Sequence, residues 1–317
     1  MFCHVPSSRI TNQYVYVYLM WRHDIGWRIG ITKNLSWRLS LERSADKILG
    51  IKACQSEAVA RFYEQLYSLK YSIPTYCFKQ RKGLSINEES LKNLYQELDV
   101  DAGVARLTSD LNIDLTSFHV CLYGVIRGNK KRIKINLNLC QRRYRSKSHV
   151  KNKKELMRSY TIYHEINLQT SDKEILKKLE NNGYSLHQAR IGKRLKITNA
   201  NLLDLKKDLK KIEKITNGIV QARAKIAKLN YQTLPALVIP AKNLLLGHYL
   251  PVKVKNEIIY DEIVEIKSKL KTSVVYDLEV DRTHNFLAEG VVVHNSIYAF
   301  RGSSMNNILG FKRDYKK

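Results

Sequence analysis

The sequence predicts an α+β protein whose C-terminal third is an all-β unit. Strand-like aromatic and β-branched stretches alternate with helical patterns up to about residue 228, and short apolar runs with polar turns follow. Hydrophobic residues make up 44% of the 317 residues, enough for packed cores in about two domains. The formal net charge is +26, which predicts a polyanionic partner, most simply DNA or another nucleic acid.

Composition also argues against several classes of protein. The sequence contains no run of 18 or more apolar residues, and its first residues lack the apolar stretch of a signal peptide. Its five cysteines include no Cys-x-x-Cys pair, which argues against a zinc ribbon and against a disulfide framework. We therefore expect a cytoplasmic protein with reduced thiols and without a membrane partner.

The first elements form a small α+β unit. Residues 14–20 and 27–32 have strand composition, and the turn at Asp24–Gly26 predicts that they form a hairpin. A helix is expected over residues 56–71, with Ser56 as its N-cap. Its apolar stripe is expected to consist of Ala58, Phe62, Leu66 and Leu69.

The middle of the chain is basic. After a strand-like stretch at 118–126, residues 127–158 contain thirteen Lys or Arg and a single acid, Glu155. Because this run lacks compensating acids, we expect it to contact phosphates. The residues expected to bind nucleic acid here are Lys130, Lys131, Arg132, Arg142, Arg143 and Arg145.

Two helices are expected after the basic run. Residues 171–174 (Ser-Asp-Lys-Glu) form a capping box that opens a short helix, which Gly183 ends. The second helix has its apolar stripe at Leu202, Leu205, Leu209 and Ile212, and its lysines face solvent. Short strands follow and predict the all-β unit: 236–239, 250–254, 257–261, 263–266, 273–280 and 291–293.

The densest chemical signal is the segment VVYDLEVDRTHNFLAEGVVVHNS, which ends at Ser296. The side-chain amide of Asn295 can attack its own backbone carbonyl, closing a succinimide and breaking the following peptide bond. The imidazole of His294 or His284 can donate a proton to the departing nitrogen, which accelerates such a step by about 10²–10⁴-fold. The Ser296 hydroxyl can accept an acyl group if a base or a carboxylate such as Asp277 activates it.

The order of these motifs resembles the C-terminal splicing region of inteins: Val-Tyr-Asp-Leu, then His-Asn-Phe, then Val-Val-His-Asn followed by Ser. The resemblance implies a β-rich, Hint-type splicing domain in which Asn295 cyclises and His294 assists the leaving group. It implies that His284 and Asp277 support this step, and that Ser296 is the first residue of the host and its nucleophile. Splicing of this kind needs no cofactor.

The tail SIYAFRGSSMNNILGFKRDY resembles a segment of UvrD/PcrA-type DNA helicases. Tyr298 offers a face for base stacking, and Arg301 offers a bidentate phosphate contact. The resemblance implies a helicase host that needs ATP and Mg²⁺ as a whole. This chain alone is not expected to hydrolyse ATP, because its sequence contains no phosphate-binding loop of the Gly-x-x-x-x-Gly-Lys-Ser/Thr type.

The Cys-led first block of inteins and their Thr-x-x-His block are not recognisable in the sequence. We therefore expect an incomplete splicing domain whose N-terminal intein and helicase portion is missing. Two arrangements stay open: a truncated chain that belongs in cis to a longer precursor, and a split partner that acts in trans.

The first unit resembles GIY-YIG nucleases. Tyr18, Arg38 and Glu64 match the strand tyrosine, helical arginine and metal-binding glutamate of that family. Arg28 replaces the second tyrosine, a departure from the pattern. If the unit is active, the resemblance implies Mg²⁺ held by Glu64. Spacing places Glu64 away from the expected apolar stripe, toward a site rim or solvent.

Four ranges summarise the expected organisation: a GIY-YIG-like α+β domain at 1–82, a basic DNA-contact region at 83–228, the splicing region at 229–295 and a helicase flank at 296–317. The leading hypothesis is the C-terminal step of protein splicing. The alternative is a DNA-binding, homing-endonuclease-like module with a vestigial splicing end. A third is a helicase fragment without its own activity.

Overall fold

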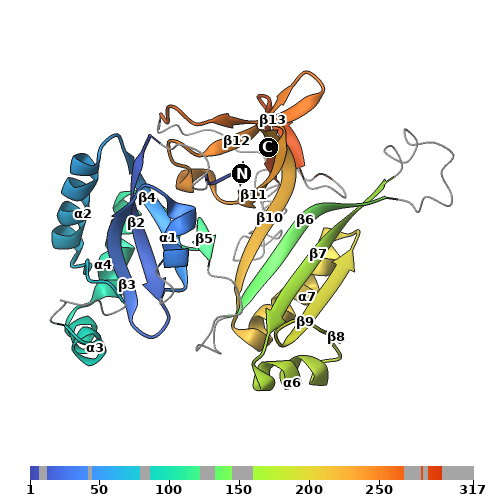
Figure 1. The fold of residues 1–317 in the computed structure, drawn as a ribbon, viewed down its shortest axis with the longest axis horizontal. Helices are drawn as coiled ribbons and strands as arrows, with labels where there is room; N and C mark the ends of the chain where they lie inside the picture. Colours follow the sequence, from blue (N-terminus) through green and yellow to red (C-terminus); the bar gives the residue numbers. More distant parts are fainter. Residues whose placement is uncertain are drawn as a thin grey trace, which may run out of the picture.

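Two β-sheets with helices packed on them form the fold in the computed structural model (Figure 1). The mixed α+β class and the strand-rich C-terminal unit are confirmed. The structure describes residues 1–6, 13–41, 45–78, 86–121, 133–144, 160–267, 280 and 285–294, with the backbone alone at 39–41 and 144. No helix within these ranges combines the length and the apolar character that a membrane crossing requires.

The smaller sheet has the order β3-β2-β4-β5 and is antiparallel. Its strands are β2 (Val15–Arg22), β3 (Gly26–Thr32), β4 (Lys47–Cys54) and β5 (Val120–Cys121). The predicted hairpin is confirmed as β2 and β3. The helices of this unit are α1 (Leu35–Leu41), α2 (Glu57–Tyr71), α3 (Glu88–Glu97) and α4 (Val100–Asp110).

Helix α2 has the predicted bounds and N-cap, but it buries a different face. The Ser56 side chain accepts a hydrogen bond from the Val59 N–H. The helix turns Ala60, Tyr67 and Tyr71 to the core. The predicted stripe lies outside, with Phe62 60% and Leu69 80% exposed. The prediction was wrong because tyrosines fill this core, and the expected stripe did not include them.

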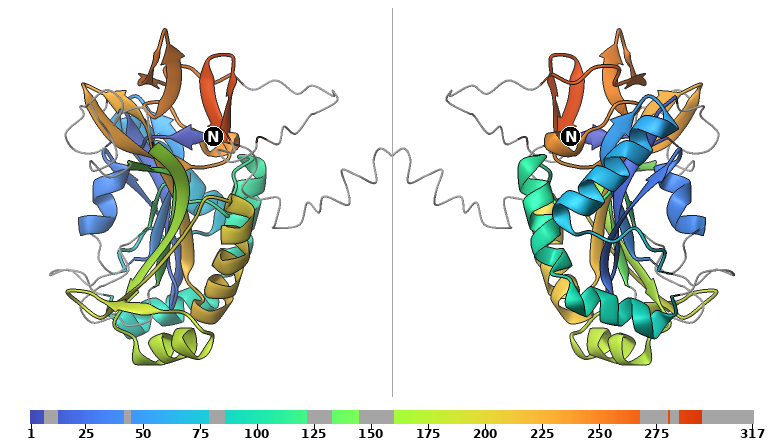
Figure 2. Two further views of the ribbon diagram at one scale, coloured as in Figure 1. Left: turned by 90° about the vertical axis from the view of Figure 1, so that its right-hand side faces the viewer. Right: turned by 90° about the vertical axis from the view of Figure 1, so that its left-hand side faces the viewer.

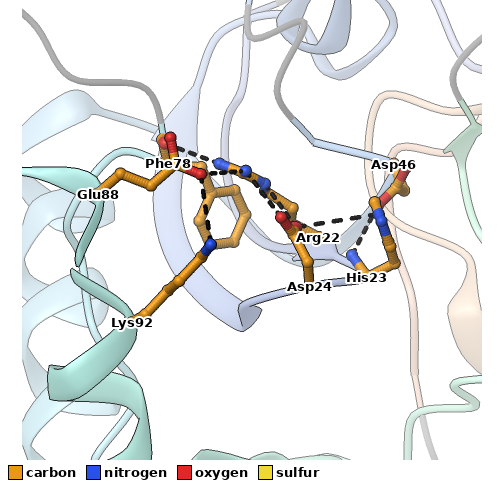
Figure 3. Close-up of polar contacts among 7 residues, drawn as sticks. All are labelled: Arg22, His23, Asp24, Asp46, Phe78, Glu88 and Lys92. Carbon is orange, nitrogen blue, oxygen red and sulfur yellow. Dashed lines mark hydrogen bonds and ion pairs between the residues drawn. The ribbon is translucent and has the colours of Figure 1, made fainter. Parts of the chain in front are cut away.

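A polar network fixes α3 to the tip of the hairpin (Figure 3). The Arg22 guanidinium pairs with Asp24 at 2.7 Å and with Glu88 of α3 at 2.8 Å, and it donates to the Phe78 carbonyl. The Arg22 side chain is 13% exposed and the Glu88 side chain 57% exposed, so the network lies at the surface of the first core. Helices α3 and α4, which the sequence placed in the basic middle region, therefore pack into the first core.

The larger sheet has eleven strands, with the path β14-β15-β12-β13-β10-β6-β7-β9-β8 and with β11 and β1 paired beside β10. Helices α6 (Lys173–Asn181) and α7 (Leu202–Thr216) belong to the same core. Figure 2 shows these helices together on one side of the sheet. The strands are β1 (Phe2–Cys3), β6 (Lys134–Tyr144), β7 (Tyr160–Thr170), β8 (Leu186–Gln188), β9 (Lys193–Asn199), β10 (Ile219–Leu229), β11 (Gln232–Val238), β12 (Tyr249–Val254), β13 (Glu257–Glu262), β14 (Asn285–Ala288) and β15 (Val291–His294).

The α7 stripe is confirmed, since Leu202, Leu205, Leu209 and Ile212 are all buried. Helix α6 begins one residue later than predicted, because the Asp172 carboxylate, and not Ser171, accepts from the first N–H groups. Residues 263–266 are not a strand. Only β5 is described from the strand expected at 118–126, because residues 122–126 lie outside the described ranges. Residues 273–279, most of another expected strand, also lie outside them.

One loop joins the two cores. Asn243, in the 3₁₀ turn η2 (Ala241–Asn243), is 2% exposed and exchanges hydrogen bonds with the backbone of Asp114 while donating to the Ser117 carbonyl. Tyr16 of β2 donates to the Leu246 carbonyl in the same loop. The start of the chain also connects the two cores. Phe2 was expected in the first domain but packs in the core of the larger sheet.

Candidate functional site

The hairpin of β14 and β15 carries the motif that the sequence singled out. Glu289 and Gly290 have φ of 49° and 82°, the conformation of a two-residue hairpin turn with both central residues left-handed. Val291 pairs with Val252 of β12, which places the hairpin at the edge of the larger sheet. In this register Asn285 lies directly opposite His294.

His294 is held inside the protein, not at its surface. Its side chain is 8% exposed, and its ring meets Phe2 edge to face with centroids 5.4 Å apart. Phe2 is itself fully buried in β1, which pairs with β11. The first strand of the chain therefore packs against the imidazole that directly precedes Asn295.

A second contact ties this hairpin to the middle of the sheet. Asn285 donates from Nδ2 to Sγ of Cys140 at 3.7 Å, and the Cys140 N–H donates to Nδ1 of His164 at 3.3 Å. Cys140 sits in a bulge of β6 with φ of 52°. Burial raises the pKa of its thiol to about 11, so the thiol is protonated and inert at neutral pH.

Of the five residues predicted for the splicing chemistry, His294 lies in the described part of the chain. Asn295, Ser296, His284 and Asp277 lie outside it. The described arrangement holds an imidazole next to Asn295 in the sequence, fixed from two sides by β1 and β14. Such a fixed imidazole can serve a proton transfer at the following peptide bond.

Comparison with known proteins decides the family. A family model described as the intein splicing domain matches residues 79–295, about two thirds of the chain. The chain belongs to this intein family. Protein splicing is therefore the general function, as the resemblance implied, and the matched range ends at Asn295. No curated protein and no solved structure matches the chain.

The residues predicted for a nuclease-like site lie before the matched range, and two of them meet. Arg38 of α1 donates from Nε to Oη of Tyr18 at 2.8 Å. Gly30 pairs with Tyr18 across the hairpin, and a Cβ on Gly30 would lie 2.5 Å from that hydroxyl. A residue without a side chain is thus needed to seat Tyr18.

Glu64 does not fit a resident metal ion. It is half-buried on the face of α2 that Ala60 and Tyr67 share, and so lies away from the expected stripe of Phe62 and Leu69, as its spacing predicted. Burial raises its pKa, while the charges of Arg28 and Arg61 lower it, and the same arginines repel a cation. Among the described residues, no group of three or more His, Cys, Asp or Glu side chains is arranged for a metal.

The predicted basic contacts are described at two positions. The guanidinium groups of Arg142 and Arg143 lie over the rings of Tyr160 and Tyr163, 4.8 and 4.9 Å from the centroids. The other predicted contacts lie outside the described ranges: Lys130, Lys131, Arg132, Arg145, Tyr298 and Arg301.

The sequence did not indicate Phe2, Cys140 or His164 as neighbours of the splicing hairpin. Phe2 reaches it from the other end of the chain, and no local pattern encodes that approach. For Cys140 a signal existed: the alternation of Leu137, Leu139 and their polar neighbours breaks at this position, as it does at a bulge.

Proposed function

We propose that this intein performs the C-terminal step of splicing at Asn295. Nδ2 of Asn295 attacks the backbone carbonyl carbon of the same residue, and the C–N bond to Ser296 breaks. His294 donates the proton that the departing nitrogen takes up, so a succinimide and a free amine result. The observation that carries this proposal is the burial of His294 between β1 and β14, directly before Asn295.

Several finer assignments belong to the same proposal. His284 and Asp277 support the step, and the Ser296 hydroxyl accepts the acyl group that an N-terminal portion supplies in cis or in trans. The residues from Ser296 on belong to a UvrD/PcrA-type helicase host, which uses ATP and Mg²⁺ while the splicing step uses no cofactor. The sequence motifs support these assignments.

Mass spectrometry of the purified chain tests the step by detecting release of residues 296–317. Asn295→Ala should abolish release, and His294→Ala should slow it by about 10²–10⁴-fold. His187→Ala is the matched control, because His187 is exposed in β8. Undiminished release from the Asn295→Ala chain would refute the mechanism.

A second candidate function is that of a DNA-binding, homing-endonuclease-like module. The hydrogen bond between Arg38 and Tyr18 favours it, because it holds a guanidinium, a group that binds phosphate, on the buried tyrosine that the nuclease resemblance singled out. The arginines beside Glu64 argue for binding without cleavage. Incubation with the intein-free helicase gene in Mg²⁺ should therefore leave the DNA intact. Cleavage that is lost in Glu64→Gln would instead establish a nuclease.

A further inference from the structure

Strand β6 carries an irregular point beside the splicing hairpin. Its register with β7 shifts there, so Leu139 and Cys140 lie opposite the single residue His164. Cys140 has φ of 52°, in the left-handed region that a residue with a side chain adopts at a cost in free energy. Bulges of this kind are frequent next to active sites, where they redirect a side chain. The side chain that this bulge redirects is the Cys140 thiol, which accepts the hydrogen bond from Asn285.

The sheet supports this bulge from one side. Strand β6 pairs in parallel with β10 as far as Leu139 and Ala224, and the two strands diverge beyond that point (Figure 1). A cavity of about 470 Å³ lies where they diverge, and Cys140, Arg142 and Lys225 are among its lining residues. Among the described residues, no strand pairs with β6 on the β10 side after Leu139. The conformation of the bulge therefore depends on its contacts with β7.

His164 of β7 supplies such a contact. Its side chain is fully buried, and its Nδ1 accepts the hydrogen bond from the Cys140 N–H at 3.3 Å. A ring nitrogen accepts only when it carries no proton, so the neutral ring has its proton on Nε2. Because a buried backbone N–H without an acceptor is costly, this bond favours the bulged conformation over its alternatives.

We propose that His164 is a positioning residue for the splicing step. It holds the bulge at Cys140, and the Cys140 thiol in turn holds the side chain of Asn285. Asn285 lies directly opposite His294 in the hairpin. A continuous series of contacts thus runs from the middle of the larger sheet to the imidazole that donates the proton. This inference rests on the function proposed for Asn295 and makes β6 and β7 part of the same site.

The expected effect on the rate comes from geometry alone. His164 does not touch the reacting bond in this scheme, and it acts only on the place of His294. A misplacement of about 1 Å can slow a reaction by about 10²-fold. The two hydrogen bonds in the series are long, at 3.3 and 3.7 Å, so their loss should move the hairpin by less than that. We therefore expect about a tenfold change in rate.

Mass spectrometry of the released residues 296–317 tests this with two variants of His164. His164→Leu removes the acceptor and should slow release by about tenfold. His164→Asn places an oxygen close to the position of Nδ1, so its rate should stay within about threefold of the unmodified chain. Equal rates in these two variants would overturn the proposal.

Thr170→Val is the matched control. Thr170 is buried near the other end of β7, and its hydroxyl accepts from the Asp172 N–H, so this variant also removes a side-chain acceptor from a backbone N–H. His164→Leu and Thr170→Val should lose similar stability in urea, while Thr170→Val should leave release unchanged. Equal slowing of release in both would mean that His164 acts through stability and not through position.

Combining His164→Leu with Asn285→Ala tests whether both residues act along one path. If they do, the double variant should release the tail no more slowly than the slower single variant. A double variant whose slowing is the product of the two single effects would overturn the proposal, because His164 would then act independently of the hairpin.

Hydrogen exchange separates this proposal from the splicing step itself. In the Asn295→Ala chain, which should keep its tail, His164→Leu should speed exchange of the backbone amides of residues 285–294. His164→Asn should restore slow exchange in the same chain. Unchanged exchange in His164→Leu would overturn the positioning role, whether or not the unmodified chain releases its tail. Faster exchange without release from the unmodified chain would support the positioning contacts and refute the splicing step alone.

Discussion

The rings of His119 and His248 meet edge to face with their centroids 4.8 Å apart, where the two cores join. The Gly50 N–H donates to Nδ1 of His119, so the neutral ring carries its proton on Nε2 and donates it to the Asn243 carbonyl. His248 is fully buried against Tyr16, and neither of its ring nitrogens has a hydrogen-bond partner. Both imidazoles are therefore held neutral in the folded protein.

We predict that stability falls on mild acidification because of this pair. Burial lowers the pKa of His119 to about 4. Burial also lowers the pKa of His248 well below 6.5, and the positive charges that His119 and His4 would carry lower it further. The unfolded chain binds these protons first, so the free energy of unfolding falls as pH drops from about 6.5 toward 4. His119 alone contributes a loss on the order of 3 kcal/mol. Urea unfolding between pH 7 and pH 4.5 measures it.

The variant His248→Phe isolates this contribution from that of the carboxylates. Phenylalanine keeps a ring against Tyr16 and His119 and removes a buried group that makes no hydrogen bond, so stability at pH 7 should not fall by more than about 1 kcal/mol. The decline in acid should become shallower than in the unmodified chain. An identical pH profile in the two proteins would contradict the role assigned to His248.

Helix α2 gives a second prediction, because the face that the sequence pattern placed in the core is exposed and the other face is buried. Leu69→Ala should change the free energy of unfolding by less than about 0.5 kcal/mol, since Leu69 is 80% exposed. Tyr67→Ala should cost about 3–5 kcal/mol, because Tyr67 is 6% exposed in the first core. Chemical denaturation of both variants measures these two changes in the free energy of unfolding. A larger loss of stability in Leu69→Ala than in Tyr67→Ala would mean that the expected stripe packs in the core after all.

Local patterns predicted the elements whose side chains pack on their near neighbours. The hairpin of β2 and β3 follows from strand composition on both sides of a Gly turn, and the α7 stripe follows from helical spacing. The strand over residues 291–293, which ends just before His294, was predicted from its run of valines. These features depend on a few residues of sequence, so the sequence alone specifies them.

Long-range pairing could not be predicted in this way. Strand β10 pairs in parallel with β6, so Ala222 lies beside Leu137 although a long stretch of chain separates them. Phe2 reaches His294 across nearly the whole chain. The polar residues of β6 and β7 gave no sign of a shared face until the register aligned Asn136 with Asn167. Such contacts arise from tertiary packing, which local propensity does not encode.

The third prediction concerns Asn285, which lies opposite His294 and bonds to Cys140. Asn285→Ala removes the bond that ties β14 to the β6 bulge, so the end of β15 is held less firmly. Release of residues 296–317 should then slow several-fold, because a small misplacement of a proton donor lowers the rate of its step. Mass spectrometry of the released tail measures the rate.

Leu287→Ala on the same strand is the control, since Leu287 is 46% exposed and should leave the rate unchanged. Cys140→Ala should slow release as Asn285→Ala does, while Cys140→Ser keeps an acceptor and should retain more of the rate. If Asn285 acts by position alone, the rate falls at every pH and the pH profile keeps its midpoint. A displaced midpoint would mean that Asn285 changes the protonation of His294 itself, and the positioning role would have to be abandoned.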